Sequence, residues 1–458
     1  MRALLAATVV VALAPASEVS AQLLQPPPRS ADGLFGGGSA NPNRSGHQLS
    51  VDAMALGSYE DQLQGDTGLG GASVTSDPLA ENRSGPSALF AGNIRYRYGR
   101  LTRYVEAGAR GFLHSFRGLD IRPVGGGDGD LRAGWNLGKA TIFTGASAAY
   151  RPTLMLNAST SGPVDITPDV VAPEDPTNGV VEIESTSRGL TSALDYNWSV
   201  RHNTSATLGY SDTLVTGLLT TNSQSHIETL THAWAFHRTT TLEMEYSYSN
   251  QAMEVGDQPA RPNDSHSGRL GLEWRKRLSR TRTISVGGAG GVMRVRSVSS
   301  FEDRDLQYNA PSGSARVRVD LGRTWSVAAD ADRNVTVLDG VTLQSFLTDV
   351  GSLWLGGRIG SAWQVAVTGS FSRGAPHEGE TGSYEAATAR AQLQYVVSSC
   401  CSVLATYSYY SHLLHDISSL APGFPNRSEN NAVRVGMSFW LPLYGRFSGT
   451  RASQTGRN

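Results

Sequence analysis

Apolar and polar residues alternate with a period of two along most of the chain, from about residue 47 to residue 442. Between residues 242 and 249, for example, Leu, Met and Tyr occupy the even positions, and Glu and Ser occupy the odd ones. This period is the pattern of a β-strand whose two faces meet different surroundings. It predicts an all-β fold of about eighteen strands, at 47–59, 87–98, 101–115, 130–137, 140–151, 184–198, 204–215, 224–236, 240–250, 266–278, 282–297, 312–321, 325–337, 346–359, 363–373, 385–397, 402–412 and 430–442.

The connections between these strands are short and long in turn. Eight of them are tight turns, at 98–100, 137–139, 201–203, 237–239, 279–281, 322–324, 360–362 and 398–400. The others are longer and polar, and the longest spans 152–183. This rhythm indicates an antiparallel up-and-down barrel whose two rims differ. In transmembrane barrels of this kind the periplasmic turns are short and the outer loops are long.

The charged face of the strands predicts which side faces the lumen. A charge on the lipid-facing side near the bilayer midplane costs about 2–4 kcal/mol, so the charged face must turn inward. A barrel of eighteen strands is also too wide for side chains to fill, which favours a water-filled pore. The predicted pore-lining residues are Arg95, Arg97, Arg110, Glu243, Glu245, Arg269, Glu273, Arg275, Arg316, Arg318, Asp320 and Arg434.

The same alternation places further charges inward and gives the lumen a modest basic excess. These are Arg132, Arg358, Arg390, Glu106, Asp195, Asp330 and Asp332. Rings of Arg select for anionic solutes. Charges that pair across strands would instead only hydrate the wall, and for any single residue this second interpretation is favoured.

The N-terminal residues have the pattern of a secretory signal peptide. Met1-Arg2 precedes an apolar run from Ala3 to Ala14, and Val19-Ser20-Ala21 forms a small-residue cleavage site. We therefore expect a signal peptide at 1–21, a flexible lead rich in Pro and Gly at 22–45, a barrel at 46–443 and a tail at 444–458. After residue 21 no apolar run reaches the length of about 18 residues that a membrane helix needs.

Composition narrows the possible functions. The net charge of −1 over 458 residues gives no field suited to nucleic acid. The adjacent Cys400 and Cys401 pair poorly in ordinary disulfide geometry, so we interpret them as turn residues rather than a metal or redox site. Asp128 and Asp130 are expected at a solvated loop tip, with Ca²⁺ binding as the weaker alternative.

Two further patterns bear on the fold and on catalysis. The apolar phase changes across Gly287–Gly291, which predicts a bulge or a bend in that strand. The chain contains no Gly-x-Ser-x-Gly, His-Glu-x-x-His or phosphate-loop motif, so we expect neither enzymatic activity nor a cofactor.

The signal peptide, the alternating strands and the closing segment 431–443 together resemble bacterial outer-membrane β-barrels. More narrowly, the chain is similar to porin-like barrels associated with exopolysaccharide secretion. One departure is that Phe439-Trp440 is followed by a polar tail, whereas such barrels usually end at an aromatic residue. Either the assembly signal is internal, or the closing strand lies nearer to 444–447.

The resemblance implies an outer-membrane location and a pore for passive passage or export of polar solutes, including anionic polysaccharide. One alternative is a structural or receptor barrel that is plugged by its own loops, and a weaker one is a barrel-embedded hydrolase. The implied partners are outer-membrane lipid, lipopolysaccharide, the barrel assembly machinery and a polar or anionic solute.

Overall fold

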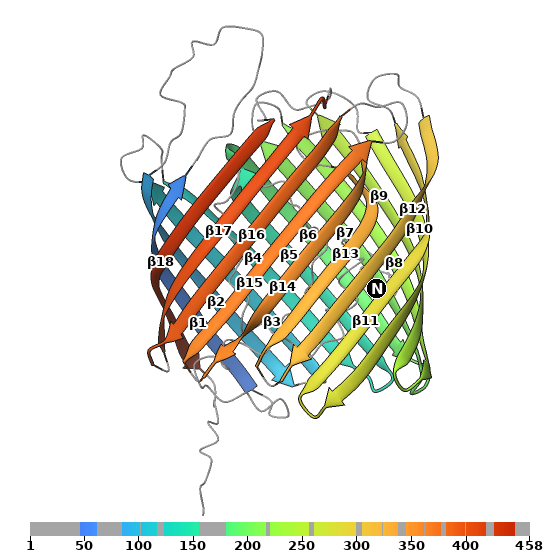
Figure 1. The fold of residues 1–458 in the computed structure, drawn as a ribbon, viewed down its shortest axis with the longest axis horizontal. Helices are drawn as coiled ribbons and strands as arrows, with labels where there is room; N and C mark the ends of the chain where they lie inside the picture. The colour runs from blue at the N-terminus through green and yellow to red at the C-terminus, as the bar shows by residue number, and fades with distance from the viewer. Residues whose placement is uncertain are drawn as a thin grey trace, which may run out of the picture.

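A computed structural model shows a single antiparallel sheet of eighteen strands closed into a barrel (Figure 1). It describes residues 46–61, 85–100, 102–116, 123–154, 180–216, 220–255, 261–298, 305–322, 324–337, 345–360, 362–376, 382–398, 400–417 and 426–444. The predicted signal peptide, the flexible lead, the longest loop and nearly all of the tail lie outside these residues. Among the described residues no helix has the length and apolarity that a membrane-spanning helix requires.

The strands are β1 (Gly46–Asp61), β2 (Gly85–Arg100), β3 (Arg103–Phe116), β4 (Val124–Asn136), β5 (Ala140–Leu154), β6 (Val180–Asn197), β7 (His202–Thr216), β8 (Thr221–His237), β9 (Thr240–Val255), β10 (Arg261–Ser279), β11 (Arg282–Val298), β12 (Asp305–Leu321), β13 (Ser326–Val337), β14 (Ser345–Ile359), β15 (Trp363–Pro376), β16 (Ser383–Val396), β17 (Cys401–His415) and β18 (Arg427–Tyr444).

Every strand pairs with its neighbour in sequence, and β18 pairs with β1 to close the ring. The predicted fold class is confirmed. Most strands extend past their predicted limits into the long connections, because a barrel wall continues beyond the apolar part that the alternation reveals. The closing strand ends at Tyr444, which pairs with Leu49.

The glycine-rich part of β11 does not contain the predicted bulge. Its pairing with β10 and β12 is continuous across Gly287–Gly291. The apolar residues change from the outward to the inward face because the inward face is buried on the C-terminal side of the glycines, while the strand register stays the same. Beyond the glycines, Met293 and Val295 face inward and are buried against Tyr308 and Ala310 of β12.

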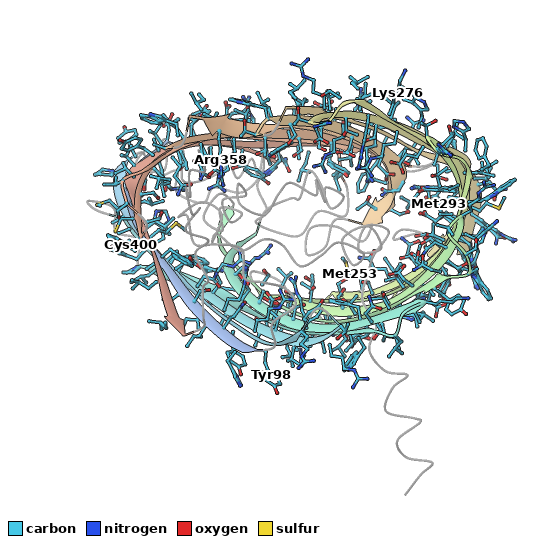
Figure 2. The ribbon with its side chains drawn as sticks, turned by 90° about the horizontal axis from the view of Figure 1, so that it is seen from below. Tyr98, Met253, Lys276, Met293, Arg358 and Cys400 are labelled. Atoms are coloured by element: carbon cyan, nitrogen blue, oxygen red, sulfur yellow. The ribbon has the colours of Figure 1, made fainter. Side chains whose placement is uncertain are left out.

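The direction of each side chain follows from a few reference positions. Looking along the barrel, Tyr98 and Lys276 point away from the oval ring, whereas Met253, Met293 and Arg358 point into it (Figure 2). Since successive strand residues point to opposite faces, these positions fix the inward and outward sets on their strands, and the pairing extends them around the ring.

The outward face carries an apolar belt of membrane height. On β16 four outward apolar residues lie between Glu385 and Tyr395, ten positions apart. At about 3.4 Å per residue and a tilt of about 40°, this separation corresponds to roughly 26 Å along the barrel axis, close to the apolar band of about 25 Å in outer-membrane barrels. Comparable exposed apolar residues occur around the ring, among them Ile94, Leu270 and Val435.

Exposed aromatic residues border this belt at the end of the short turns. They include Tyr98, Trp135, Trp234, Trp274, Trp363 and Tyr395. Amphipathic aromatic side chains at this depth form the interfacial girdle of a membrane barrel. Trp440 is instead buried and lies on the inward face of β18. The protein is an outer-membrane β-barrel.

Candidate functional site: the charged lumen

The twelve predicted pore-lining residues all occupy inward-facing positions, on β2, β3, β9, β10, β12 and β18. Eleven of them fall into two groups, one in β2–β4 and one in β9–β13. The centres of these two charged sectors, β3 and β11, lie eight strands apart in a ring of eighteen, so the sectors lie on nearly opposite sides of the lumen. Arg434 belongs to neither.

In the β2–β4 sector the charges pair between neighbouring strands. Arg95 lies 3.5 Å from Glu106, measured from Nε to Oε1. The Arg97 guanidinium lies 5.0 Å from the centre of the Tyr104 ring, which is within cation–π range. These contacts hold the Arg side chains along the wall.

Asp128 and Asp130 correct one sequence prediction, because they lie within β4 and not at a loop tip. Asp128 is 3.3 Å from Arg110 Nη2 on β3, and Asp130 is 3.0 Å from Arg132 Nε on its own strand. Their run of glycines suggested a loop, but from Gly125 to Gly129 every second residue of β4 is a glycine that faces outward. Each carboxylate neutralises an inward Arg.

The β9–β13 sector contains three more ion pairs. Arg316 Nε donates to Asp330 over 2.7 Å, and Arg318 Nε donates to Asp320 over 3.3 Å. Arg269 Nη1 donates to Asp332 over 3.1 Å although 63 residues separate them in sequence. Arg269 is on β10 and Asp332 on β13, so this side chain lies across β11 and β12.

The glycines of β11 leave room for this long reach. Gly291 pairs with Arg269 and places no side chain beside it on the inward face. At Gly291 a β-carbon would collide with the carbonyl oxygen of Gly268. The glycine-rich segment therefore allows β10 and β11 to pack closely and leaves room for the Arg269 side chain.

Carboxylates without an Arg partner of their own add negative charge to this sector. Glu243 and Glu273 interact electrostatically with Arg316, and Glu245 interacts with Arg269. Arg275 lies nearer the short turns, and no carboxylate partner is recorded for it among the described residues. The inward charges of the β9–β13 sector therefore sum to a net negative charge.

Arg434 faces inward but does not reach lumen water, since it is only 2 % exposed. Its Nη2 donates to Oε1 of the fully buried Glu60 over 2.9 Å, and His114 Nε2 lies 3.1 Å from the same oxygen. Glu60 is on β1 and Arg434 on β18. The pair stabilises the seam where the barrel closes, a role different from the predicted pore lining.

The basic excess expected from the sequence is offset in the structure. Four carboxylates that the sequence analysis did not place inward, Asp52, Glu60, Asp128 and Asp130, face the lumen side of the wall. The sequence contained a signal for Asp52 and Glu60, because each lies an even number of residues from Leu56, which faces inward on β1. Positive and negative charges are therefore nearly balanced.

Between the charged sectors lies a wall of neutral hydroxyl groups on β6–β8. Its inward residues are mostly Ser and Thr, including Ser187, Thr191, Ser205, Thr207, Ser211, Thr213, Ser223, Ser225, Thr229 and Thr231. Ser205, Thr207, Ser223 and Thr229 are buried, whereas the other named residues are partly exposed. Hydroxyl groups donate and accept hydrogen bonds, so the partly exposed ones are suited to water and to polyhydroxylated solutes.

Inward residues near the outer ends of β14–β18 are inaccessible to solvent. Phe346 packs edge-on against Tyr384 at 5.2 Å between ring centres, and the Tyr384 hydroxyl lies 2.9 Å from Thr348 Oγ1. Tyr410 and His412 on β17 are buried as well. This part of the wall does not face open water.

The described residues hold no group of three or more His, Cys, Asp or Glu side chains arranged for a metal ion. Cys400 and Cys401 are free thiols at the turn before β17, with their Sγ atoms 2.7 Å apart.

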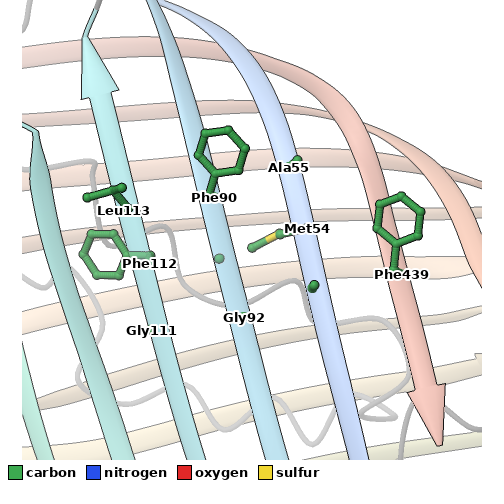
Figure 3. Close-up of a pocket in the computed structure, with 10 residues that line it drawn as sticks. Met54, Ala55, Phe90, Gly92, Gly111, Phe112, Leu113 and Phe439 are labelled. Atoms are coloured by element: carbon green, nitrogen blue, oxygen red, sulfur yellow. The ribbon is translucent and has the colours of Figure 1, made fainter.

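An apolar groove of about 440 Å³ lies on the barrel wall across β18, β1, β2 and β3 (Figure 3). Phe90, Leu113 and Phe439 flank it, while Gly92 and Gly111 form part of its floor. Its lining carries no charged side chain and faces the lipid side, so we assign it no role toward a polar solute.

Comparison with known proteins matches no family model and no curated protein. Among solved structures the chain is similar to OccK11 (OpdR) of Pseudomonas aeruginosa, with 12% identity over 88% of this chain and 99% of that chain and a TM-score of 0.41. OpdQ of Pseudomonas aeruginosa is 11% identical over 87% of this chain and 98% of that chain, with a TM-score of 0.40. BauA, the ferric preacinetobactin receptor from Acinetobacter baumannii, is 9% identical over 87% of this chain and 80% of that chain, with a TM-score of 0.45. Likenesses this distant identify no solute.

Proposed function

We propose that this barrel is a non-enzymatic, water-filled conduit for passive passage or export of polar solutes. The observation that supports it is the solvent exposure of the inward charges. The side chain of Arg316 is 56% exposed and that of Arg110 is 45% exposed, although each is ion-paired and faces the lumen. An ionised group in a dry interior would need complete pairing, so half-exposed ion pairs favour a lumen filled with water.

Conductance of the purified barrel in planar lipid bilayers tests this proposal. We expect stepwise conductance that scales with salt concentration, together with weak selectivity between cations and anions, because the lumen charges are nearly balanced. Absence of conductance steps at every voltage and salt concentration would contradict the pore.

We propose carbohydrate as the solute class, with anionic polysaccharide as one candidate cargo. The β6–β8 wall supports this, because its hydroxyl groups match those of sugars. Neutral and anionic oligosaccharides of equal length can be compared by how strongly each reduces the current through the open pore. If neither blocks the current better than polyethylene glycol of equal size, the solute is not a carbohydrate.

A loop-plugged structural or receptor barrel is the second candidate. It is favoured by the solvent-inaccessible inward residues of β14–β18, such as Tyr410 and Phe346. Deletion of residues 152–183 distinguishes the two. A large rise in conductance supports a plugged barrel, and an unchanged conductance supports the open conduit.

A further inference from the structure

The end of the barrel that carries the short turns has an unusual charge. The exposed cations in these turns and the adjoining strand ends include Arg100, Arg103, Lys139, Arg201, Arg238, Lys276, Arg280 and Arg282. They include both lysines of the chain. The segments 99–103, 136–139, 197–202, 236–240 and 278–282 contain no Asp or Glu. We call these eight residues the basic rim.

The strand residues of the basic rim point away from the lumen. Lys276 projects from the outer side of the ring (Figure 2). Arg103 pairs in register with the outward Trp135, and Arg282 pairs with the outward Leu321, so both share that direction. The ligand of such side chains lies beside the barrel, at the level of the membrane surface.

Exposed apolar residues accompany these cations. Leu137, Phe236 and Leu278 are each followed two residues later by a cation, and Val200 is followed directly by one. A membrane interface favours this combination, because the apolar side chain enters the acyl region while the cation meets a phosphate.

Most of the described outward cations at the other end of the barrel for which side-chain contacts are given are paired within the protein, although the exposed Arg294 on β11 is not. On the outward face Arg188 lies 2.8 Å from Asp212, and Arg373 lies 3.5 Å from Glu385. Arg333 is likewise paired with Asp349. By contrast, no carboxylate partner is recorded within the described residues for Lys139, Arg201, Arg238, Lys276, Arg280 or Arg282. Unneutralised positive charge is therefore concentrated at the periplasmic end.

We propose that the basic rim binds the anionic headgroups of phospholipids in the periplasmic leaflet of the outer membrane. Each Lys or Arg near an anionic lipid surface contributes about fivefold to binding, an attraction that fades within about a Debye length. The rim selects phosphatidylglycerol-like lipids over zwitterionic ones and holds the turns at the leaflet surface. An anionic polymer passing through the lumen is the weaker alternative, because the strand cations point outward.

Native tryptophans provide the reporter for the test. Trp135, Trp198, Trp234, Trp274 and Trp363 lie in or beside the short turns, at the level of the basic rim. The full-length barrel is reconstituted in vesicles that contain brominated phosphatidylglycerol or brominated phosphatidylethanolamine, and fluorescence quenching gives the relative affinity of the two lipids.

The test variant is Lys139→Gln/Arg238→Gln/Arg280→Gln. The matched control, Arg188→Gln/Arg333→Gln/Arg373→Gln, removes the same charge from the outer end. We expect the preference of the wild type for phosphatidylglycerol to fall at least about threefold in the test variant, to be retained in the control, and to weaken in high salt.

Three outcomes would overturn the proposal: no lipid preference in the wild type, an equal loss in both variants, or binding of soluble alginate that only the test variant loses while its lipid preference is unchanged. Conductance of the same variants reports on the pore separately, so the failure of one proposal is distinguishable from the failure of the other.

Discussion

The seam between the first and last strands depends on a buried ion pair whose loss has a calculable effect. In Arg434→Met the apolar stem of the side chain is retained and the charge is removed. Glu60 then stays fully buried without the guanidinium 2.9 Å away, and it keeps His114 and the hydroxyl groups of Ser58 and Ser87 as neighbours. Leaving one partner of a buried ion pair uncompensated costs about 3–5 kcal/mol, which reduces the folding equilibrium constant by roughly 10² to 10⁴.

Urea unfolding of the barrel in detergent micelles measures this loss, with the mobility of the folded barrel on a cold gel as a second readout. Arg373→Met is the matched control, because Arg373 forms an exposed outward pair with Glu385. Exposed pairs contribute about 0–1 kcal/mol. The double variant Glu60→Gln/Arg434→Met should be more stable than Arg434→Met alone, since it buries no unpaired charge.

The reasoning is refuted if Arg434→Met loses no more stability than the Arg373→Met control. It is also refuted if removing the Glu60 charge as well recovers nothing, because the cost would then come from packing and not from an unpaired carboxylate.

Three further predictions follow from the lumen and its rims. Arg316→Gln removes a lumen cation and should shift the reversal potential toward cation selectivity, whereas the outward-facing Arg294→Gln should leave it unchanged. Gly291→Val should prevent folding or cost more than about 3 kcal/mol, since its β-carbon would meet backbone atoms of β10; a barrel as stable as the wild type in urea would contradict this. A membrane-impermeant thiol reagent should label intact cells poorly and label cells with a permeabilised outer membrane well. Because the hydrogen bond with the Cys401 thiol lowers the pKa of Cys400, Cys400 should react first, and mass spectrometry of the labelled peptide identifies the site.

The number of strands and the faces of their side chains could be predicted from the sequence. Both depend on local chemistry, because a strand has a period of two and a charge is costly on a lipid face. The twelve selected lumen residues accordingly occupy inward positions. The same local rule failed where surroundings changed along one strand, as at Met293 and Val295, which are apolar and yet face inward.

Which charges neutralise one another was decided only by the closed barrel. Arg269 and Asp332 are 63 residues apart, and Glu60 and Arg434 are 374 apart, so no sequence pattern joins them. Closure of the ring brings the first strand against the last, and the glycines of β11 let one Arg side chain cross two strands. The sequence determined that charges line this barrel, whereas the tertiary structure determined which of them meet lumen water and which are buried at its seam, because those contacts form only when distant strands pair.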